Sequence, residues 1–192
     1  MAAKRELKPG AAFVLMLVMV CCALIYGSYK HWEERCDLAA MYFDSVDQQI
    51  DLNIRTAHNL HTVAARHLDA DSTVLSSLKD VIGQMSDGEK ELSYKVRMCE
   101  RFAQIAKPLL ESLVTLPTVQ QDSRDYMYAS QMLPQAVAEC EKRDAFENYD
   151  LYAMSFNEER ASTFTGLMAK IGGVDALQYA GYDSSEIIEM VK

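Results

Sequence analysis

The sequence lacks several residue patterns that mark catalytic sites. It contains no Glu-x-x-His pair, so the motif of di-iron helical bundles is missing. Gly172-Gly173 does not have the spacing of a phosphate-binding loop, and no serine or cysteine is paired by sequence with a histidine base. We therefore predict a protein that is not an enzyme and has no cofactor, and we assign no catalytic, cofactor-binding or metal-binding residue.

Basic residues are scarce over most of the chain. From residue 31 onward there are 15 Lys and Arg against 27 Asp and Glu, a net charge of −12. Phosphate backbones repel a surface of this sign, which argues against a nucleic-acid partner. Such acidity is typical of a solvated helical surface.

Cysteines are too few for a disulfide framework. Cys21 and Cys22 lie in an apolar segment, and the other three, Cys36, Cys99 and Cys140, are odd in number. Cys99 and Cys140 fall on apolar helical positions, where a free thiol packs as a small hydrophobe. A Cys99–Cys140 disulfide stays open as an alternative if this region is extracytoplasmic.

Charge is absent from Ala11 to Tyr29, a run of nineteen residues. As a helix this run is about 28 Å long, close to the hydrocarbon thickness of a bilayer. We predict a short basic N-terminus over 1–10 and a transmembrane helix over 11–29. A cleaved signal peptide is the alternative, but Tyr26-Gly27-Ser28-Tyr29 is a poor cleavage site.

The flanks of this segment predict its direction. Three basic residues and the amino terminus precede it, and two basic residues mixed with two glutamates follow it: Lys4, Arg5 and Lys8, then Lys30, Glu33, Glu34 and Arg35. Positive charge stays preferentially in the cytoplasm. We therefore expect a cytoplasmic N-terminus and an extracytoplasmic remainder.

Apolar positions beyond the segment repeat with helical spacing. Alternating steps of four and three predict one long helix with one packing seam, formed by Phe43, Asp47, Ile50, Ile54, Ala57, His61, Ala64, Leu68, Asp71, Leu75, Leu78, Ile82 and Met85. The same spacing predicts a second helix from Leu92 to Leu113, which Pro108 should kink or end before the turn at Pro117.

A third helix is predicted from about Thr118 to about Phe164. Its apolar stripe changes phase between Cys140 and Ala145, as a short insertion in a heptad pattern produces. Val174 to Tyr182 is expected to form a last short helix. The predicted fold class is all-α: a transmembrane helix followed by an elongated antiparallel bundle of three long helices and a short C-terminal helix over 33–182, then a tail over 183–192.

Two short motifs suggest a family. Val46-Asp47-x-Gln49 is followed by Asn59-Leu60, ten residues after Gln49, and Tyr149-Asp150 by Phe156-Asn157, seven residues after Tyr149. In order and spacing, together with the N-terminal anchor and the turn at Leu116-Pro117, the chain resembles a divergent member of the LemA family over roughly 11–181.

The resemblance implies an all-helical bundle anchored in the bacterial cytoplasmic membrane by a single pass. Several positions depart from the family pattern: Leu52-Asn53 replaces arginines, His58 replaces a proline and Asp150 replaces an asparagine. A function that needs a basic patch near residue 52 is therefore in doubt.

Some polar residues have a second interpretation. His58 and His61 are spaced for joint metal ligation, with His67 nearby, although a buried or boundary histidine is the simpler interpretation. The acidic residues Asp47, Asp71 and Asp144 lie on or near the seams, where paired carboxylates can do acid–base work or fix register. Asn59, Tyr149, Asp150 and Asn157 are expected to form hydrogen bonds inside the bundle rather than to bind a ligand.

Taken together, these features favour a non-catalytic interaction or scaffold protein at the bacterial membrane or envelope. Its partners would be the membrane, other proteins and a second copy of the chain. The alternatives are an extracytoplasmic sensory or ligand-binding bundle that signals through a partner, and a metal-binding bundle enzyme. Ile54→Asp is expected to unfold the bundle by placing a charge in the seam.

Overall fold

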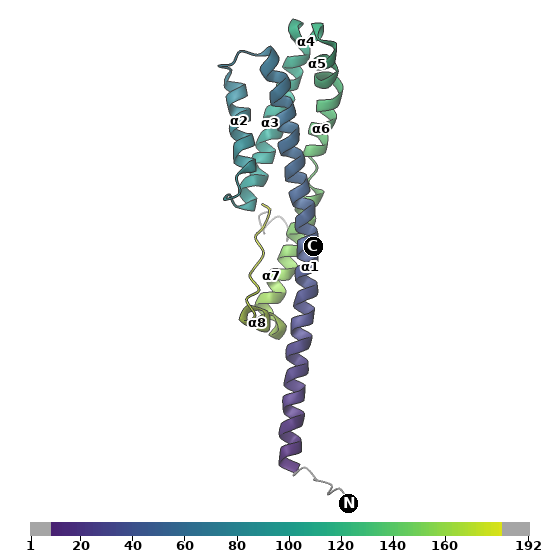
Figure 1. The fold of residues 1–192 in the computed structure, drawn as a ribbon, viewed down its shortest axis with the longest axis vertical. Helices are drawn as coiled ribbons and strands as arrows, with labels where there is room; N and C mark the ends of the chain where they lie inside the picture. Colours follow the sequence, from purple (N-terminus) through teal and green to yellow (C-terminus); the bar gives the residue numbers. More distant parts are fainter. Residues whose placement is uncertain (1–8, 182–192) are drawn as a thin grey trace, which may run out of the picture. The chain divides into compact units, whose positions relative to one another are not determined.

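The computed structural model describes residues 9–181, and every regular element in this range is a helix (Figure 1). The elements are α1 (Pro9–His67), α2 (Thr73–Ser86), α3 (Leu92–Thr115), α4 (Pro117–Gln121), α5 (Ser123–Met127), the π-helix η1 (Tyr128–Met132), α6 (Leu133–Cys140), α7 (Asp144–Ser162) and α8 (Phe164–Ile171). The predicted all-α class is thus confirmed for the described residues. Two compact units divide this range, one of residues 9–40 with 154–177 and one of 41–153 with 178–181.

Helix α1 contains the predicted apolar segment and continues well beyond it. It runs without interruption from Pro9 to His67, and among the described helices it is the one long and apolar enough to cross a membrane. None of the residues in its most apolar window is buried. The predicted boundary at Tyr29 therefore marks a change of composition inside one helix.

The first unit is held together by the packing of α7 against α1. Trp32 is 3% exposed and meets the ring of Phe156 edge to face, with ring centroids 5.0 Å apart. The Glu159 carboxylate pairs with two side chains of α1: His31 Nε2 lies 2.6 Å from Oε1, and Arg35 Nη2 lies 2.9 Å from Oε2. These three contacts fix the C-terminal half of α7 beside residues 31–35 of α1.

The second unit is an antiparallel bundle. Tyr94 near the start of α3 donates a hydrogen bond of 2.7 Å to Gln84 near the end of α2, as expected for neighbours joined by a short turn (Figure 1). α3 then packs on α6. Helix α1 contacts α6 through Gln49, which binds the Glu139 carbonyl, and α5 through Arg66, which binds Asp125.

The prediction of one helix from Phe43 to Met85 is wrong. α1 ends at His67, and five residues link it to α2, with the Ser72 N–H bonded to the Asp69 carbonyl. Asp and Ser, the residue types at 69 and 72, have low helix propensity, which favours a turn here. The turn leaves the four–three spacing intact, so the sequence pattern does not reveal it.

The predicted seam in α1 is rotated from the buried face. Phe43 is 45% exposed, whereas Val46 and Leu60 are fully buried. Six of the buried positions also repeat in steps of four and three, Val46, Ile50, Asn53, Ala57, Leu60 and Ala64, and Thr56 and Val63 are buried beside them. The predicted seam and the observed buried face share Ile50, Ala57 and Ala64. They differ at positions such as Asn53, which is polar but 0% exposed. Ile54, whose replacement by aspartate was predicted to unfold the bundle, is only half-buried.

The predicted third long helix is broken into several elements. The chain leaves helical geometry at residues 141–143, where the apolar stripe changes phase, and η1 supplies a wider turn just before Pro134. Carbonyls at the end of α6 accept hydrogen bonds from amides of α1: Gln49 Nε2 lies 3.0 Å from the Glu139 oxygen, and Asn53 Nδ2 lies 3.4 Å from the Cys140 oxygen. These amides stabilise the break. Pro108, in contrast, does not end α3, which continues to Thr115.

The predicted helix over Val174 to Tyr182 is not formed in residues 174–181, and Tyr182 lies outside the described range, as do 1–8 and the tail over 183–192. Side chains of α7 bind this backbone instead. Asn157 accepts the N–H of Leu177 and donates to its carbonyl, both at 2.9 Å. The short C-terminal helix is α8, which lies earlier in the chain.

Candidate functional site

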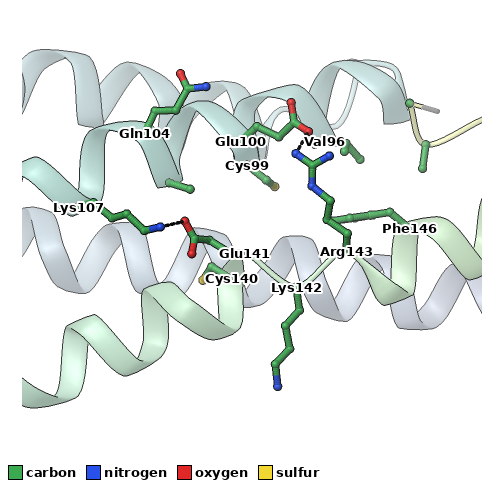
Figure 2. Close-up of a pocket in the computed structure, with 13 residues that line it drawn as sticks. Val96, Cys99, Glu100, Gln104, Lys107, Cys140, Glu141, Lys142, Arg143 and Phe146 are labelled. Carbon is green, nitrogen blue, oxygen red and sulfur yellow. Dashed lines mark hydrogen bonds and ion pairs between the residues drawn. The ribbon is translucent and has the colours of Figure 1, made fainter. Parts of the chain in front are cut away.

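A cavity of about 550 Å³ lies in the second unit between α3, the α6–α7 connection and the C-terminal segment (Figure 2). The lining residues on α3 run from Val96 to Lys107, and the opposite side is formed by residues 140–143 and Phe146. Ala180 and Gly181 close one end.

Two ion pairs cross the cavity from α3 to the α6–α7 connection. Lys107 Nζ lies 2.7 Å from Glu141 Oε1, and Arg143 Nη2 lies 2.7 Å from Glu100 Oε1, as Figure 2 shows. All four side chains are at least one-third exposed, so the pairs contribute little to stability. Their position allows them to exchange partners with a charged ligand.

Two thiols line the inner part of the cavity. Cys99 and Cys140 are both buried and both free. Burial raises the pKa of Cys99 to about 12, with a smaller contribution from nearby Cys140. Burial also raises the pKa of Cys140, although a hydrogen bond with Thr56 opposes the shift. Both groups are therefore neutral thiols at pH 7, and a neutral thiol is a poor nucleophile and a poor metal ligand.

The C-terminal wall of the cavity is fixed by Asp150. This carboxylate is 1% exposed and accepts the N–H of Ala180 at 2.5 Å and that of Gly181 at 3.2 Å. Gly181 has a φ of +145°, a conformation that disfavours other residues. The prediction that Asp150 and Asn157 form internal hydrogen bonds is confirmed, but their partners are backbone groups of the C-terminal segment. Tyr149 is buried against the ring of Phe43, and Asn59 is exposed.

A second polar cluster lies where α1 meets α5. Asp125 is 1% exposed, and Arg66 Nη1 lies 2.7 Å and His67 Nε2 2.9 Å from its carboxylate oxygens. Asp122 caps α5 by accepting the Arg124 and Asp125 N–H groups. Burial by itself raises the pKa of Asp125, but the hydrogen bonds from His67 and Arg66 and the charge of Arg66 outweigh it and hold the pKa below its usual value.

The histidines considered for metal binding lie in different surroundings. His58 is exposed, His61 is half-buried, and His67 is held by Asp125. Among residues 9–181 there is no group of three or more His, Cys, Asp or Glu side chains placed to hold a metal ion. Asp47, Asp71 and Asp144 are each exposed on a different helix or turn and form no carboxylate pair.

Sequence reasoning missed the cavity charges and Asp125. Glu100, Lys107, Glu141 and Arg143 have the composition of an ordinary solvated face, and only the break after Cys140 places them opposite one another. Asp125 had a weak signal, since it follows the capping residue Asp122 by three positions. No family model, curated protein or solved structure matches this chain.

Proposed function

We propose that the chain is a non-catalytic, single-pass membrane protein whose helical bundle acts as an interaction or scaffold component at the bacterial membrane or envelope. The observation that supports this most is the surface of α1. Eight consecutive apolar side chains, from Phe13 to Val20, are each at least 50% exposed. A core helix of a soluble protein buries such side chains, whereas a lone membrane span presents them to lipid.

The charged residues on either side of the span indicate which side of the membrane the bundle lies on. Basic residues before it outnumber those after it, which favours a cytoplasmic N-terminus and an extracytoplasmic bundle. The resemblance to the LemA family agrees with this arrangement. The acidic, mostly polar surface of the remaining chain suits protein partners better than nucleic acid.

Thiol labelling in intact cells tests the anchor and its direction together. Cys36 is exposed and follows the span by seven residues, so a membrane-impermeant maleimide can report its side of the membrane. We expect the full chain in the membrane fraction and labelling without permeabilisation, lost in Cys36→Ser. A chain found in the soluble fraction would contradict the anchor, and labelling only after permeabilisation would contradict the direction.

The cavity supports a second candidate function, the binding of a small ligand. Its volume of about 550 Å³ lies in the range of ligand pockets, and it combines apolar walls with the two ion pairs Lys107–Glu141 and Arg143–Glu100. The ligand class that fits is a small molecule with an apolar body and charges of both signs.

Native mass spectrometry of the purified full chain tests this candidate. Ala103 lines the cavity, so Ala103→Trp would fill it. A bound small molecule that is retained by the original chain and lost in the variant would support binding. If each sample shows only the mass of its own unliganded protein, the result would count against binding.

A further inference from the structure

We infer that α8 is an interfacial helix whose apolar face lies on the lipid surface at the end of the α1 span. The inference rests on the proposed membrane anchor and deepens it by adding a second contact with the same bilayer. Its partner is lipid, at the boundary between headgroups and acyl chains.

One face of α8 is apolar and uncovered. Phe164, Leu167 and Ile171 are 60%, 50% and 72% exposed, and their spacing of three and four residues places them together on the helix. The opposite face, with Gly166 and Ala169, is buried. α8 contains no acidic residue that an anionic leaflet would repel.

Contacts within the first unit place α8 at the level where the span ends. Glu159 of α7 binds His31 and Arg35, which follow Tyr29 directly, and α8 begins five residues after Glu159 (Figure 1). Tyr26 and Tyr29 are 68% and 66% exposed at that end of the span. Exposed tyrosines at the end of an apolar helix are typical of the membrane interface.

The orientation of α8 is held firmly by its neighbours. Thr163 caps its first turn by accepting the Gly166 N–H at 2.9 Å. Gly166 sits so close to α7 that an added Cβ would lie 2.5 Å from the Arg160 carbonyl oxygen. Arg160 Nε also donates to the Val174 carbonyl at 2.7 Å and so fixes the chain after α8. The apolar face therefore stays exposed because the other face is committed to α7.

The size of the face favours lipid over a second copy of the chain. α8 has eight residues and is about 12 Å long. A stable protein interface buries about 1,000 Å² or more, which three side chains do not supply. Lipid needs no such area, because the neighbouring span already holds the helix at the surface, and burial of a small apolar face then adds to membrane binding.

Depth-dependent fluorescence quenching tests the inference on the full chain. Cysteine-free variants carrying Val18→Cys, Leu167→Cys or Lys170→Cys are labelled with an environment-sensitive fluorophore. Each is reconstituted in vesicles of phosphatidylcholine and phosphatidylglycerol that contain nitroxide lipids. Val18 reports the span, Leu167 reports the apolar face of α8, and exposed Lys170, beside that face, is the matched control.

We expect the Leu167 label to have blue-shifted emission and to be quenched more by nitroxides near the headgroup than by those near the chain end. The Val18 label should show the opposite depth preference, and the Lys170 label should be quenched mainly by aqueous iodide. If Val18 is quenched by lipid but Leu167 only by iodide, the interfacial helix is refuted and the anchor stands. A Leu167 label shielded from both quenchers means that protein covers the face, which also refutes the inference. If Val18 itself is not quenched by lipid, the anchor fails.

Discussion

Replacing Asp125 with alanine should destabilise the second unit more than the same change at any exposed aspartate. The Asp125 carboxylate is 1% exposed and ties α5 to the end of α1. An ionised carboxylate only accepts hydrogen bonds, so Arg66 and His67 both donate to it. Asp125→Ala removes the acceptor of both residues at once.

The expected loss follows from the exposure of the two partners. The Arg66 side chain is 49% exposed, so water replaces its lost partner at little cost. The His67 side chain is 8% exposed and would be left buried without an acceptor. A hydrogen bond to a charged group contributes about 1.5–3 kcal/mol, so we expect a decrease of about 2 kcal/mol in the free energy of unfolding.

Guanidinium unfolding of the full chain in detergent micelles, followed by circular dichroism, measures this loss. Asp71→Ala is the matched control. Because Asp71 is exposed, its replacement should change the free energy of unfolding by no more than about 0.5 kcal/mol. Equal midpoints for the two variants would refute the reasoning, since they would show that the buried cluster contributes no more than a surface charge.

The same cluster predicts a pH dependence. The pKa of Asp125 lies below its usual value in the folded chain, so its contribution is present above the unfolded pKa of about 3.9 and is lost as the pH falls through the lower, folded pKa. The difference in unfolding free energy between the original chain and Asp125→Asn should therefore be constant near pH 7 and shrink in acid. A difference that grows in acid would contradict the assignment.

Three further predictions concern buried groups. Asn53→Asp should cost about 3 kcal/mol at pH 7, because it places a carboxylate against backbone carbonyls, whereas Asn59→Asp on the exposed face should be nearly neutral in unfolding measurements. Gly166→Ala should lower the thermal midpoint, since its Cβ would meet backbone oxygens, while Gly83→Ala in open space should raise it. Cys99, whose pKa is about 12, should resist alkylation at pH 7 until the chain is unfolded; rapid alkylation of the folded chain would disprove its burial.

Helix content and the faces of several helices could be predicted from the sequence because apolar spacing reports them directly. The buried positions of α3, among them Leu92, Val96, Cys99 and Leu113, repeat the expected pattern. In α1 the pattern is ambiguous, since two registers share the same apolar residues. The face that is buried includes Asn53, whose amide binds the Cys140 carbonyl. The spacing of apolar residues does not reveal a hydrogen bond of this kind.

The chain reversals and the cavity could not be predicted, because they depend on tertiary hydrogen bonds. The turn after His67 preserves the helical spacing. The C-terminal segment is bound by Asp150 and Asn157 through backbone groups that carry no sequence signature. The two ion pairs of the cavity join α3 to residues that follow the end of α6 at Cys140, and the Cys140 carbonyl is bound by amides from α1.

The central claim is that the apolar part of α1 crosses a bilayer as a lone helix, and a labelling scan from residue 11 to residue 29 tests it most directly. Single-cysteine variants of the full chain, labelled and reconstituted in vesicles with nitroxide lipids, would report the depth of each position. Because no residue of the most apolar window is buried, quenching by deep nitroxides should peak near Val20 and show no helical periodicity. Uniform quenching by aqueous iodide along the whole scan would contradict the membrane span.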